Sequence, residues 1–366
     1  MIIEILLIVT AAAYITEIIV LIIGINLANR TNTVLNYEPM VSIIVAARNE
    51  EEFIADCLTS LTQLEYPKDK LELIIVNDRS TDKTPDIIES FEKRYPNIKT
   101  LTTNFEGGNL RGKTNAIAQG ADISTGEILM FTDADCKVPR TWVSGIVKYF
   151  DEETGIVGGF TVLESKNTFE RIQYLDWLFL FGIASGAVGL NIPLTIVGNN
   201  LSVRRSAYQA TGGYRIIPFS VTEDYALVQA VQKLKSYKIK FPINSKLVVR
   251  SQPCKTLCHL FHQRQRWSTG GLDMIFIGKL IASISWFISL LLIVGIYFTP
   301  KLIWVLIFFI KFITDYYFIN IPSKQLQMKS SLKDIFIFEI YLLIYVIIIP
   351  FIAIFSRKII WKERTL

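Results

Sequence analysis

Charged side chains are scarce in this 366-residue chain: they make up 19% of it, whereas apolar residues make up 51%. A soluble domain usually carries about 25% charged residues. Intrinsic disorder is excluded, because disordered segments combine few apolar residues with high net charge. The same deficit argues against a wholly soluble enzyme and favours a membrane protein.

The excess of positive charge is also small, since 38 Lys and Arg against 33 Asp and Glu leave a net charge of +5. The chain has no stripe of basic residues with interleaved aromatics, which nucleic-acid-binding proteins carry. We therefore expect no nucleic-acid partner. Much of the excess lies beside apolar segments, where it suits anionic lipid head groups, so membrane lipids are expected partners.

Cysteine and histidine are few, with four cysteines and two histidines. Cys254, Cys258 and His259 lie close in sequence, but no second CxxC half accompanies them. We interpret them as helical neighbours in a reducing cytosol rather than as a metal site. The chain also lacks the Gly-x-Gly-x-x-Gly, Walker and Gly-x-Ser-x-Gly motifs, which disfavours dinucleotide-binding, P-loop and α/β-hydrolase chemistry.

What the sequence has instead is long apolar runs, and the first covers residues 5–25. Only Glu17 interrupts it, and 21 residues span ~30 Å of hydrocarbon. No basic segment precedes it, as a signal peptide would require, so we predict an uncleaved anchor. Glu17 either faces a partner helix or is protonated. Arg30 follows directly, which favours the cytoplasm for the next domain. We expect a multi-pass protein of the cytoplasmic membrane.

Three further candidate spans lie near the C-terminus, at residues 275–298, 302–320 and 335–355. The second contains Lys311 and Asp315, which stand at i and i+4 on a helix and could neutralise each other. Three crossings would place a basic tail outside, against the positive-inside rule. Either one candidate is re-entrant or interfacial, or the rule is broken. The tail's basic residues are Arg357, Lys358, Lys362 and Arg364.

An apolar segment at residues 175–197 carries Asp176 as its only charge. A crossing there would separate the acidic motifs before and after it onto opposite sides of the membrane. Because those motifs are argued below to share one site, we interpret the segment as a buried or interfacial helix and loop.

The middle of the chain predicts an α/β domain. Short β-branched runs at 41–47, 71–76, 98–102 and 127–132 alternate with helical patterns at 51–64, 87–94 and 113–123. This alternation predicts a mostly parallel sheet. Ligands bind such sheets at the carboxyl ends of strands, and polar clusters follow three of the runs there. These clusters are residues 47–50, 77–78 and 133–135.

Three motifs in this domain and after it carry possible chemistry. Asp133 and Asp135 end a strand one residue apart, so both could approach a hard cation such as Mg²⁺ or Mn²⁺. Residues 222–224 (Thr-Glu-Asp) either cap a helix or supply Asp224 as a general base. On a helix Gln263, Arg266 and Trp267 would share a face that offers an amide, a guanidinium and a flat ring. The competing interpretation of that face is an interfacial helix with a Trp anchor.

The ordered set of Asp78, Asp133-Ala-Asp135, Thr222-Glu-Asp224 and Gln263-x-x-Arg266-Trp267 resembles the D, DxD, D, QxxRW pattern of membrane-bound family 2 glycosyltransferases. These include cellulose, hyaluronan and chitin synthases and ceramide glucosyltransferases. Smaller matches accompany it over about residues 39 to 270. They are residues 41–50, Gly112-Lys113-x-Asn115-Ala116 and residues 198–205.

The resemblance implies a GT-A fold, a Rossmann-like and mostly parallel sheet, acting on a nucleotide-sugar donor with inversion at the anomeric carbon. It implies that Asp78 contacts the nucleotide, with Lys113 nearby. Asp133 and Asp135 would handle the metal and diphosphate, with Asp135 the more direct ligand. The remaining roles are Asp224 as base, Gln263 and Arg266 on the diphosphate, and Trp267 at the acceptor. Asn77 departs from the pattern, because many relatives carry Asp there.

We therefore expect an inverting enzyme that moves a sugar, from a UDP-sugar in the first instance, to a lipid or lipid-linked glycan at the cytoplasmic face. A processive polysaccharide synthase is the alternative enzyme, and a non-catalytic membrane scaffold is the alternative of another class. The expected domains are an anchor at 1–30, the glycosyltransferase domain at 38–253, an interfacial helix at 254–272, a membrane region at 273–356 and a basic tail at 357–366.

Overall fold

The computed structural model describes residues 1–104, 106–355, 360–361 and 364–365, which form two compact units. The sheet unit comprises the described residues of Ala28–Leu163, Thr195–Gln252 and Ile360–Leu366. The helical unit comprises those of Met1–Leu27, Glu164–Leu194 and Pro253–Ile359. Residues 164–194 thus leave the predicted 38–253 segment and join the helices. Most of the predicted basic tail lies outside the described residues.

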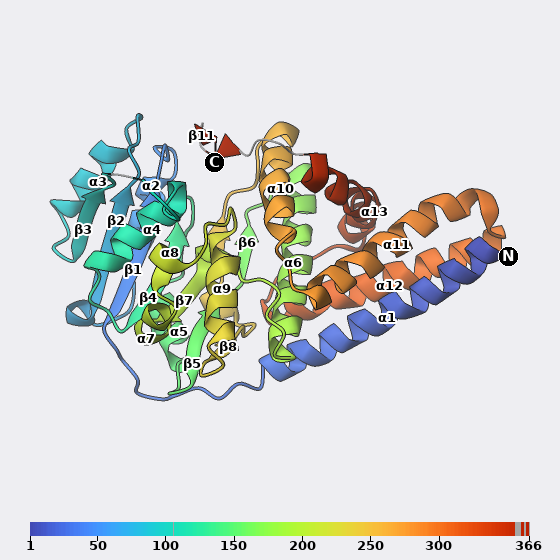
Figure 1. The fold of residues 1–366 in the computed structure, drawn as a ribbon, viewed down its shortest axis with the longest axis horizontal. Coiled ribbons are helices and arrows are strands. Elements are labelled where there is room, and N and C mark those ends of the chain that lie inside the picture. Colours follow the sequence, from blue (N-terminus) through green and yellow to red (C-terminus); the bar gives the residue numbers. More distant parts are fainter. Residues whose placement is uncertain (105, 356–359, 362–363, 366) are drawn as a thin grey trace. The chain divides into compact units, whose positions relative to one another are not determined.

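A seven-stranded sheet organises the sheet unit (Figure 1). Six strands run parallel, as the strand–helix alternation predicted, and β7 alone runs antiparallel to its neighbours β4 and β5. The spatial order is β3 (Ile98–Thr102), β2 (Leu71–Asn77), β1 (Val41–Ala47), β4 (Ile128–Asp133), β7 (Leu201–Arg204), β5 (Thr154–Gly158) and β8 (Lys238–Lys240). A separate parallel pair joins β6 (Thr161–Leu163) to β9 (Val249–Ser251).

Both faces of the central strands are covered, which explains their continuous apolar runs. One face of β1 joins the same apolar core as α2 (Ile54–Thr62), whereas Ile44 points at α4 (Gly112–Ile123). A Cβ on Gly120 of α4 would stand 2.7 Å from the Ile44 Cγ2 atom. Only glycine allows α4 to lie this close to the sheet, and this closeness fixes the start of α4 over the strand ends.

Helix ends differ from the sequence-based expectations by a few residues. Helix α2 begins at Ile54 rather than at residue 51, because the Glu50 carbonyl accepts the amides of Phe53 and Ile54 in a turn. Helix α3 (Thr84–Glu92) begins three residues early, since Pro85 suits the first turn of a helix. Helix α9 (Glu223–Lys233) begins at Glu223, so both acidic residues of the 222–224 motif lie in its first turn.

Short helical elements connect the strands of the sheet unit, and a separate antiparallel pair is formed by β10 (Ile360–Trp361) and β11 (Arg364–Thr365). The short helical elements are η1 (Lys68–Lys70), α5 (Trp142–Ile146), η2 (Val147–Tyr149), η3 (Gly198–Asn200), α7 (Arg205–Ala210), α8 (Gly213–Ile216) and η4 (Ser245–Leu247).

Six helices form the helical unit, and five of them are long and apolar enough to cross a membrane. The sixth, α10 (Leu257–Gly271), carries the Gln263–Trp267 motif. Of the five, α6 differs because 78% of its apolar window is buried by protein, as the interpretation of residues 175–197 required. The five are α1 (Ile2–Ala28), α6 (Thr168–Gly189), α11 (Phe276–Phe298), α12 (Lys301–Gln325) and α13 (Leu332–Phe355).

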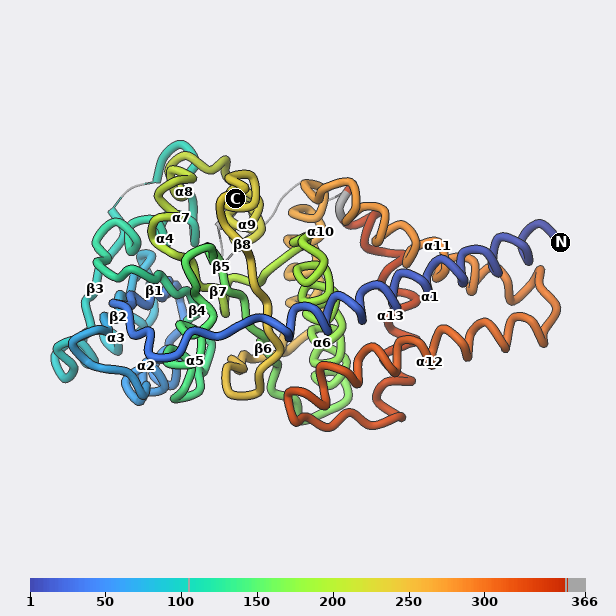
Figure 2. Tube along the Cα trace, turned by 90° about the horizontal axis from the view of Figure 1, so that it is seen from below, coloured from blue at the N-terminus to red at the C-terminus, as the bar shows by residue number. Residues whose placement is uncertain are grey.

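Helices α1, α11 and α12 lie alongside one another, whereas α13 runs across them (Figures 1 and 2). Near one end of the bundle, Gly295 of α11 faces Leu7 of α1. Near the other end, α1 meets α6 so closely that a Cβ on Gly24 would lie 2.0 Å from the Gly186 carbonyl oxygen. These contacts hold the unit together by small-residue packing, as in other membrane bundles.

A buried polar cluster joins three of these helices. Lys311 of α12 lies 2.7 Å from an Asp315 oxygen and 2.6 Å from a Glu339 oxygen of α13. The Tyr14 hydroxyl of α1 donates a hydrogen bond of 2.5 Å to Asp315. The i, i+4 pairing expected from the sequence is therefore confirmed, and it extends to two further helices.

Candidate active site at the strand ends

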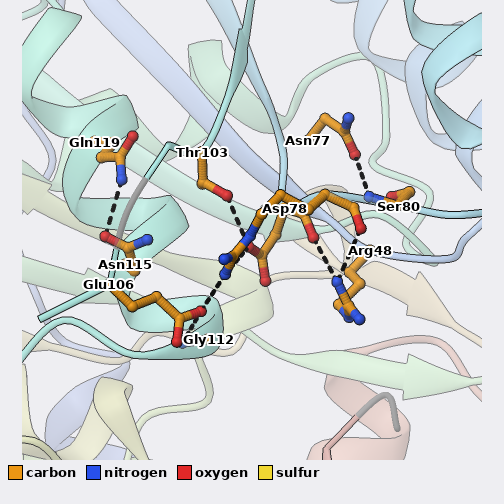
Figure 3. Close-up of polar contacts among 10 residues, drawn as sticks. Arg48, Asn77, Asp78, Ser80, Thr103, Glu106, Gly112, Asn115 and Gln119 are labelled. Carbon is orange, nitrogen blue, oxygen red and sulfur yellow. Dashed lines mark hydrogen bonds and ion pairs between the residues drawn. The ribbon is translucent and has the colours of Figure 1, made fainter. Parts of the chain in front are cut away.

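Asp78 follows β2 and is held rigidly below the surface of the sheet edge, with 1% of it exposed. Its amide donates to the Ala47 carbonyl at the end of β1. The Thr103 hydroxyl donates to Asp78 Oδ1 over 2.8 Å, and Arg48 donates to the Asp78 carbonyl over 2.8 Å (Figure 3). These contacts fix the Asp78 carboxylate at the end of β2, next to the end of β1.

Asn77 shapes the turn that presents Asp78. Its Oδ1 atom accepts the Ser80 amide over 3.0 Å, which an amide side chain does without adding charge (Figure 3). Arg79 takes a left-handed conformation with φ of 53° and pairs with Glu106, which in turn accepts the Gly112 amide. The departure from the family pattern at Asn77 thus has a structural role, and the turn is tied to the start of α4.

Lys113, the second residue of α4, joins two acidic motifs. Its Nζ atom lies 2.7 Å from Asp133 Oδ1 and 2.9 Å from Glu223 Oε1. Burial alone would lower the pKa of Lys113, but the charges of Asp133 and Glu223 outweigh burial and raise it. Lys113 is therefore a permanent cation beside the carboxyl ends of β1 and β4, where a diphosphate can meet it.

Asp133 and Asp135 end β4 with partly exposed side chains. The Ser251 hydroxyl donates to Asp135 Oδ2 over 3.2 Å, and Asp133 is turned toward Lys113. Within the described residues no group of three or more His, Cys, Asp or Glu side chains gathers around a point. Two carboxylates fit a Mg²⁺- or Mn²⁺-type ion only if substrate phosphates and water complete its oxygen shell, which is how such ions commonly bind.

Asp224 is positioned by the backbone. Its Oδ2 atom accepts the Gly198 amide over 2.7 Å, and Oδ1 accepts the Tyr225 amide over 2.8 Å. A Cβ at residue 198 would meet the Asp224 side chain at 3.3 Å, so glycine gives it room there. Burial first, and then the charge of Glu223, raise the pKa of Asp224 to about 6. A carboxylate tuned in this way suits a general base.

Glu223 is the site residue that the sequence reasoning missed. It was weighed only as part of a helix cap, yet it is buried and pairs with Lys113. It lies 110 residues from Lys113, and nothing in the spacing indicates that pair. The one feature of the sequence that could have indicated a role for Glu223 is its position directly before Asp224 in the 222–224 motif.

Gln263, Arg266 and Trp267 lie on α10 in the helical unit, whereas the other predicted site residues lie in the sheet unit. The Trp267 ring packs against Trp177 of α6 at 5.7 Å between centroids, and the Arg264 guanidinium covers it at 4.5 Å. Arg264 is buried and paired with Asp176. Arg266 is only half-buried and has no ion-pair partner among the described residues. Of the two arginines, Arg266 is the one available to a ligand.

The structure thus gathers Asp78, Lys113, Asp133, Asp135 and Asp224 at one edge of the sheet, where carboxylate acceptors lie beside a lysine and beside backbone N–H donors. Strands β2 and β4 flank β1 there, so their ends lie roughly 10 Å apart. That span suits a ligand with separate nucleoside and diphosphate parts.

Comparison with known proteins identifies the family of the chain. The sequence matches the Glycosyl transferase family 2 domain over residues 42–212 and the Glycosyl transferase family group 2 over residues 128–356. The chain belongs to the family 2 glycosyltransferases, which confirms the resemblance drawn from the ordered motifs.

Curated relatives include a probable glycosyltransferase of Bacillus subtilis, YdaM, which is 32% identical over 63% of this chain and 55% of its own. The β-monoglucosyldiacylglycerol synthase of Nostoc sp. is 32% identical over 64% and 49%. The poly-β-1,6-N-acetyl-D-glucosamine synthase of Staphylococcus epidermidis is 29% identical over 64% and 55%. The chain spans about half the length of the curated relatives it matches.

Among solved structures, a mannosyltransferase from Pyrobaculum calidifontis, determined with GDP-Man and Mn²⁺, superposes with a TM-score of 0.66. The two share 17% identity over 97% of this chain and 100% of that one. This likeness establishes the fold, and the predicted GT-A architecture is confirmed.

Proposed function

We propose that this protein transfers a sugar from a nucleotide-sugar, with UDP as the expected nucleotide, to the hydroxyl group of a membrane lipid. The observation that carries the proposal is the cluster of Lys113, Asp133 and Asp224 at the carboxyl ends of the parallel strands. It combines a permanent cation, strand-end carboxylates and a carboxylate whose pKa of about 6 suits proton transfer.

In the proposed reaction Asp224 accepts the proton of the acceptor hydroxyl as its oxygen attacks the anomeric carbon. The bond between that carbon and the diphosphate oxygen breaks with inversion, and the nucleoside diphosphate leaves with its electron pair. Lys113 stabilises the charge that develops on the leaving group. By motif position, Gln263 and Arg266 hold the same diphosphate, and Asp78 holds the nucleoside.

Asp133 and Asp135 would hold a divalent ion, Mn²⁺ or Mg²⁺, together with the donor diphosphate. Their oxygen atoms are the ligands that these ions prefer, and two carboxylates leave coordination positions for phosphate. Such an ion supplies Lewis-acid stabilisation of the leaving group. The Mn²⁺ in the Pyrobaculum calidifontis mannosyltransferase complex supports this assignment.

A lipid acceptor is favoured by the relatives named β-monoglucosyldiacylglycerol synthase and by the apolar helices that accompany the site in one chain. The relatives named as poly-N-acetylglucosamine synthases support the alternative, a processive synthase. A non-catalytic scaffold would have no use for a pH-tuned carboxylate beside a cation.

We also propose that α1, α11 and α12 cross the cytoplasmic membrane and that α13 lies across them without crossing. The sheet unit, which follows α1, would then face the cytoplasm, as Arg30 indicates. The chain would return to the cytoplasmic side at the end of α12, and α13 would begin on that side. The conflict between the basic tail and the positive-inside rule would disappear.

The experiment that tests the function incubates the purified full-length protein with a panel of UDP-sugars and total membrane lipids, and identifies products by mass. One sugar on a lipid supports the proposal, a sugar polymer supports the processive alternative, and no product from any donor supports the scaffold. A parallel reaction with a metal chelator should lose sugar transfer, and added Mn²⁺ or Mg²⁺ should restore it. Full activity after stringent chelation would remove the metal from the site.

A further inference from the structure

Asp135, the carboxylate expected to contact the metal most directly, is held by two side chains of the sheet unit. The Ser251 hydroxyl donates to its Oδ2 atom over 3.2 Å, and the Cys136 thiol lies 3.4 Å from its Oδ1 atom as a weak donor. Ser251 and Cys136 are buried, whereas Asp135 is partly exposed. The protein therefore fixes the carboxylate from the inside and leaves part of the side chain accessible to a ligand.

The two carboxylates at the end of β4 differ in the charge of these neighbours. Lys113 Nζ lies 2.7 Å from Asp133 Oδ1, so a cation already offsets much of the charge of Asp133. A hydroxyl and a thiol carry no charge, so Ser251 and Cys136 orient Asp135 without offsetting its charge. Asp135 is therefore better suited than Asp133 to attract a divalent ion.

Backbone pairing on both sides of β9 holds Ser251 in place. On one side β9 pairs in parallel with β6, where Leu163 is the partner of Ser251. On the other side Arg250 and Lys137 exchange both backbone hydrogen bonds, over 2.7 and 2.9 Å, and Lys137 follows Asp135 by two residues. A side chain on a paired strand is placed more precisely than one on a loop. Ser251 is therefore part of a rigid frame around the segment that follows β4.

The register of this pairing aims the Ser251 side chain at Asp135. Side chains alternate along β9, so Arg250 is exposed while Val249 and Ser251 are buried. Val249 belongs to the apolar core that β1 and α2 share, which anchors the buried face of the strand. Because Arg250 stands opposite Lys137, its neighbour Ser251 falls within reach of Asp135. The contact is a consequence of the strand pairing.

A fixed carboxylate binds a cation more tightly than a mobile one. The terminal torsion of an aspartate side chain has a broad rotational profile, so an unrestrained carboxylate must be immobilised when an ion binds. A hydrogen bond that already fixes the carboxylate removes this cost from the binding step. Hydrogen-bond partners of metal ligands are typically worth about 10–100-fold in metal affinity.

We propose that Ser251 is a positioning residue for Asp135, and that its hydroxyl holds the carboxylate in the orientation in which it binds a divalent ion. The assignment rests on the proposed function and adds a residue that lies outside the ordered motifs. Ser251 acts through Asp135 and does not itself bind the ion. Its loss therefore weakens the metal site without removing a ligand.

The test measures Mn²⁺ binding to the purified full-length protein from the electron paramagnetic resonance signal of the free ion. UDP or GDP is present at saturation, whichever of the two the unmodified protein binds. Asp135→Ala removes the proposed ligand and should give the largest loss of affinity. Ser251→Ala should weaken Mn²⁺ binding about 10–100-fold, and Ser251→Thr, which keeps the hydroxyl, should restore most of the affinity.

Ser202 on β7 provides the matched control. It is 0% exposed and Ser251 is 3% exposed, and the Ser202 hydroxyl has no hydrogen-bond partner among the described residues. Ser202→Ala should leave Mn²⁺ binding unchanged, and both Ser→Ala variants should keep a melting temperature close to that of the unmodified protein. Equal losses of Mn²⁺ affinity in both variants, or a loss that Ser251→Thr does not restore, would show a packing effect and overturn the proposal.

Two further measurements separate positioning from packing. Adding Ser251→Ala to Asp135→Ala should cause no further loss of Mn²⁺ affinity, because the carboxylate that Ser251 orients is already gone. In transfer assays Ser251→Ala should raise the Mn²⁺ concentration for half-activation by the same factor as the loss of affinity, while kcat at saturating Mn²⁺ stays close to that of the unmodified protein. An additive loss in the double variant, or a lower kcat with unchanged half-activation, would contradict positioning.

The outcomes also distinguish this proposal from the proposed function. If the unmodified protein binds no Mn²⁺ with either nucleotide, the proposed metal site fails, and the role of Ser251 fails with it. If Asp135→Ala lowers Mn²⁺ affinity and Ser251→Ala does not, the metal site stands and only the role of Ser251 is wrong.

Discussion

Two lysines in this molecule have the same kind of surroundings but lie in different units. Lys113 in the sheet unit and Lys311 in the helical unit each contact two carboxylates at 2.6–2.9 Å. The side chain of Lys113 is 17% exposed, and that of Lys311 is 3% exposed. Because a charge in hydrocarbon is costly, the Lys311 cluster must stay paired, whereas water or a diphosphate can reach Lys113. A lysine paired with two carboxylates thus holds helices together in the helical unit, whereas in the sheet unit the same kind of cluster is the proposed ligand site.

The largest effect should come from Asp224, the proposed base, which lies beside the cluster of Lys113, Asp133 and Glu223. Asp224→Asn keeps the shape of the side chain but cannot accept the acceptor proton, so turnover should fall by about 10²–10⁴-fold while donor affinity stays nearly unchanged. Single-turnover kinetics with a donor-binding assay would measure both. Asp315→Asn is the control, because Asp315 belongs to the buried cluster around Lys311. It should leave turnover per folded molecule intact. Lost donor affinity with normal turnover would make Asp224 a binding residue.

Substitution of each lysine tests directly whether the Lys311 cluster stabilises the fold while the Lys113 cluster binds the donor. Lys311→Met leaves Asp315 and Glu339 buried without a cation, which should destabilise the fold by about 3–5 kcal/mol. Lys113→Met should instead reduce donor binding and turnover with a smaller loss of stability. Thermal unfolding in detergent and turnover per folded molecule separate the two. Combining Lys311→Met with Glu339→Gln should recover part of the stability. An unchanged melting temperature for Lys311→Met would contradict a stabilising role of the Lys311 ion pairs.

Substitution of Trp267 tests whether helix α10 contributes to the proposed site around Lys113 or only anchors the protein. Trp267→Ala should raise the acceptor KM about tenfold, the scale of a lost aromatic contact, while hydrolysis of the donor, where present, persists. Trp286, whose indole donates to the Ile347 carbonyl, offers a matched control within the bundle. If both Trp→Ala variants only lower the yield of folded protein, Trp267 is an anchor.

The smallest effect is a pH profile. Asp224 works as a base only when deprotonated, and its pKa is raised to about 6, so kcat/KM should be full above that pH and fall about tenfold per pH unit below it. Glu223→Gln removes a neighbouring negative charge and should move this limb to lower pH. A limb that does not move would show that the titrating group is not Asp224.

The sequence predicted four of the seven strands of the sheet and the polar clusters at their carboxyl ends, because β-branched runs and strand-end polar clusters are local signals. It could not show the pair of Arg264 with Asp176, since these residues are 88 positions apart and only folding brings them together. The helical spacing selected Arg266 as the ligand-binding arginine, but it gave no sign that Arg264 is buried in an ion pair. The direction of α13 was equally hidden, because apolar composition suits a helix that crosses a membrane and one that lies across a bundle.

The bond between Tyr14 and Asp315 joins residues separated by 301 positions. During synthesis α1 leaves the ribosome 301 positions ahead of Asp315, so the Tyr14 hydroxyl is made long before its native acceptor. Lys311 and Asp315 enter the bilayer as a pair, and Glu339 follows with α13. The buried polar cluster of the bundle is therefore complete only after both α12 and α13 have been made.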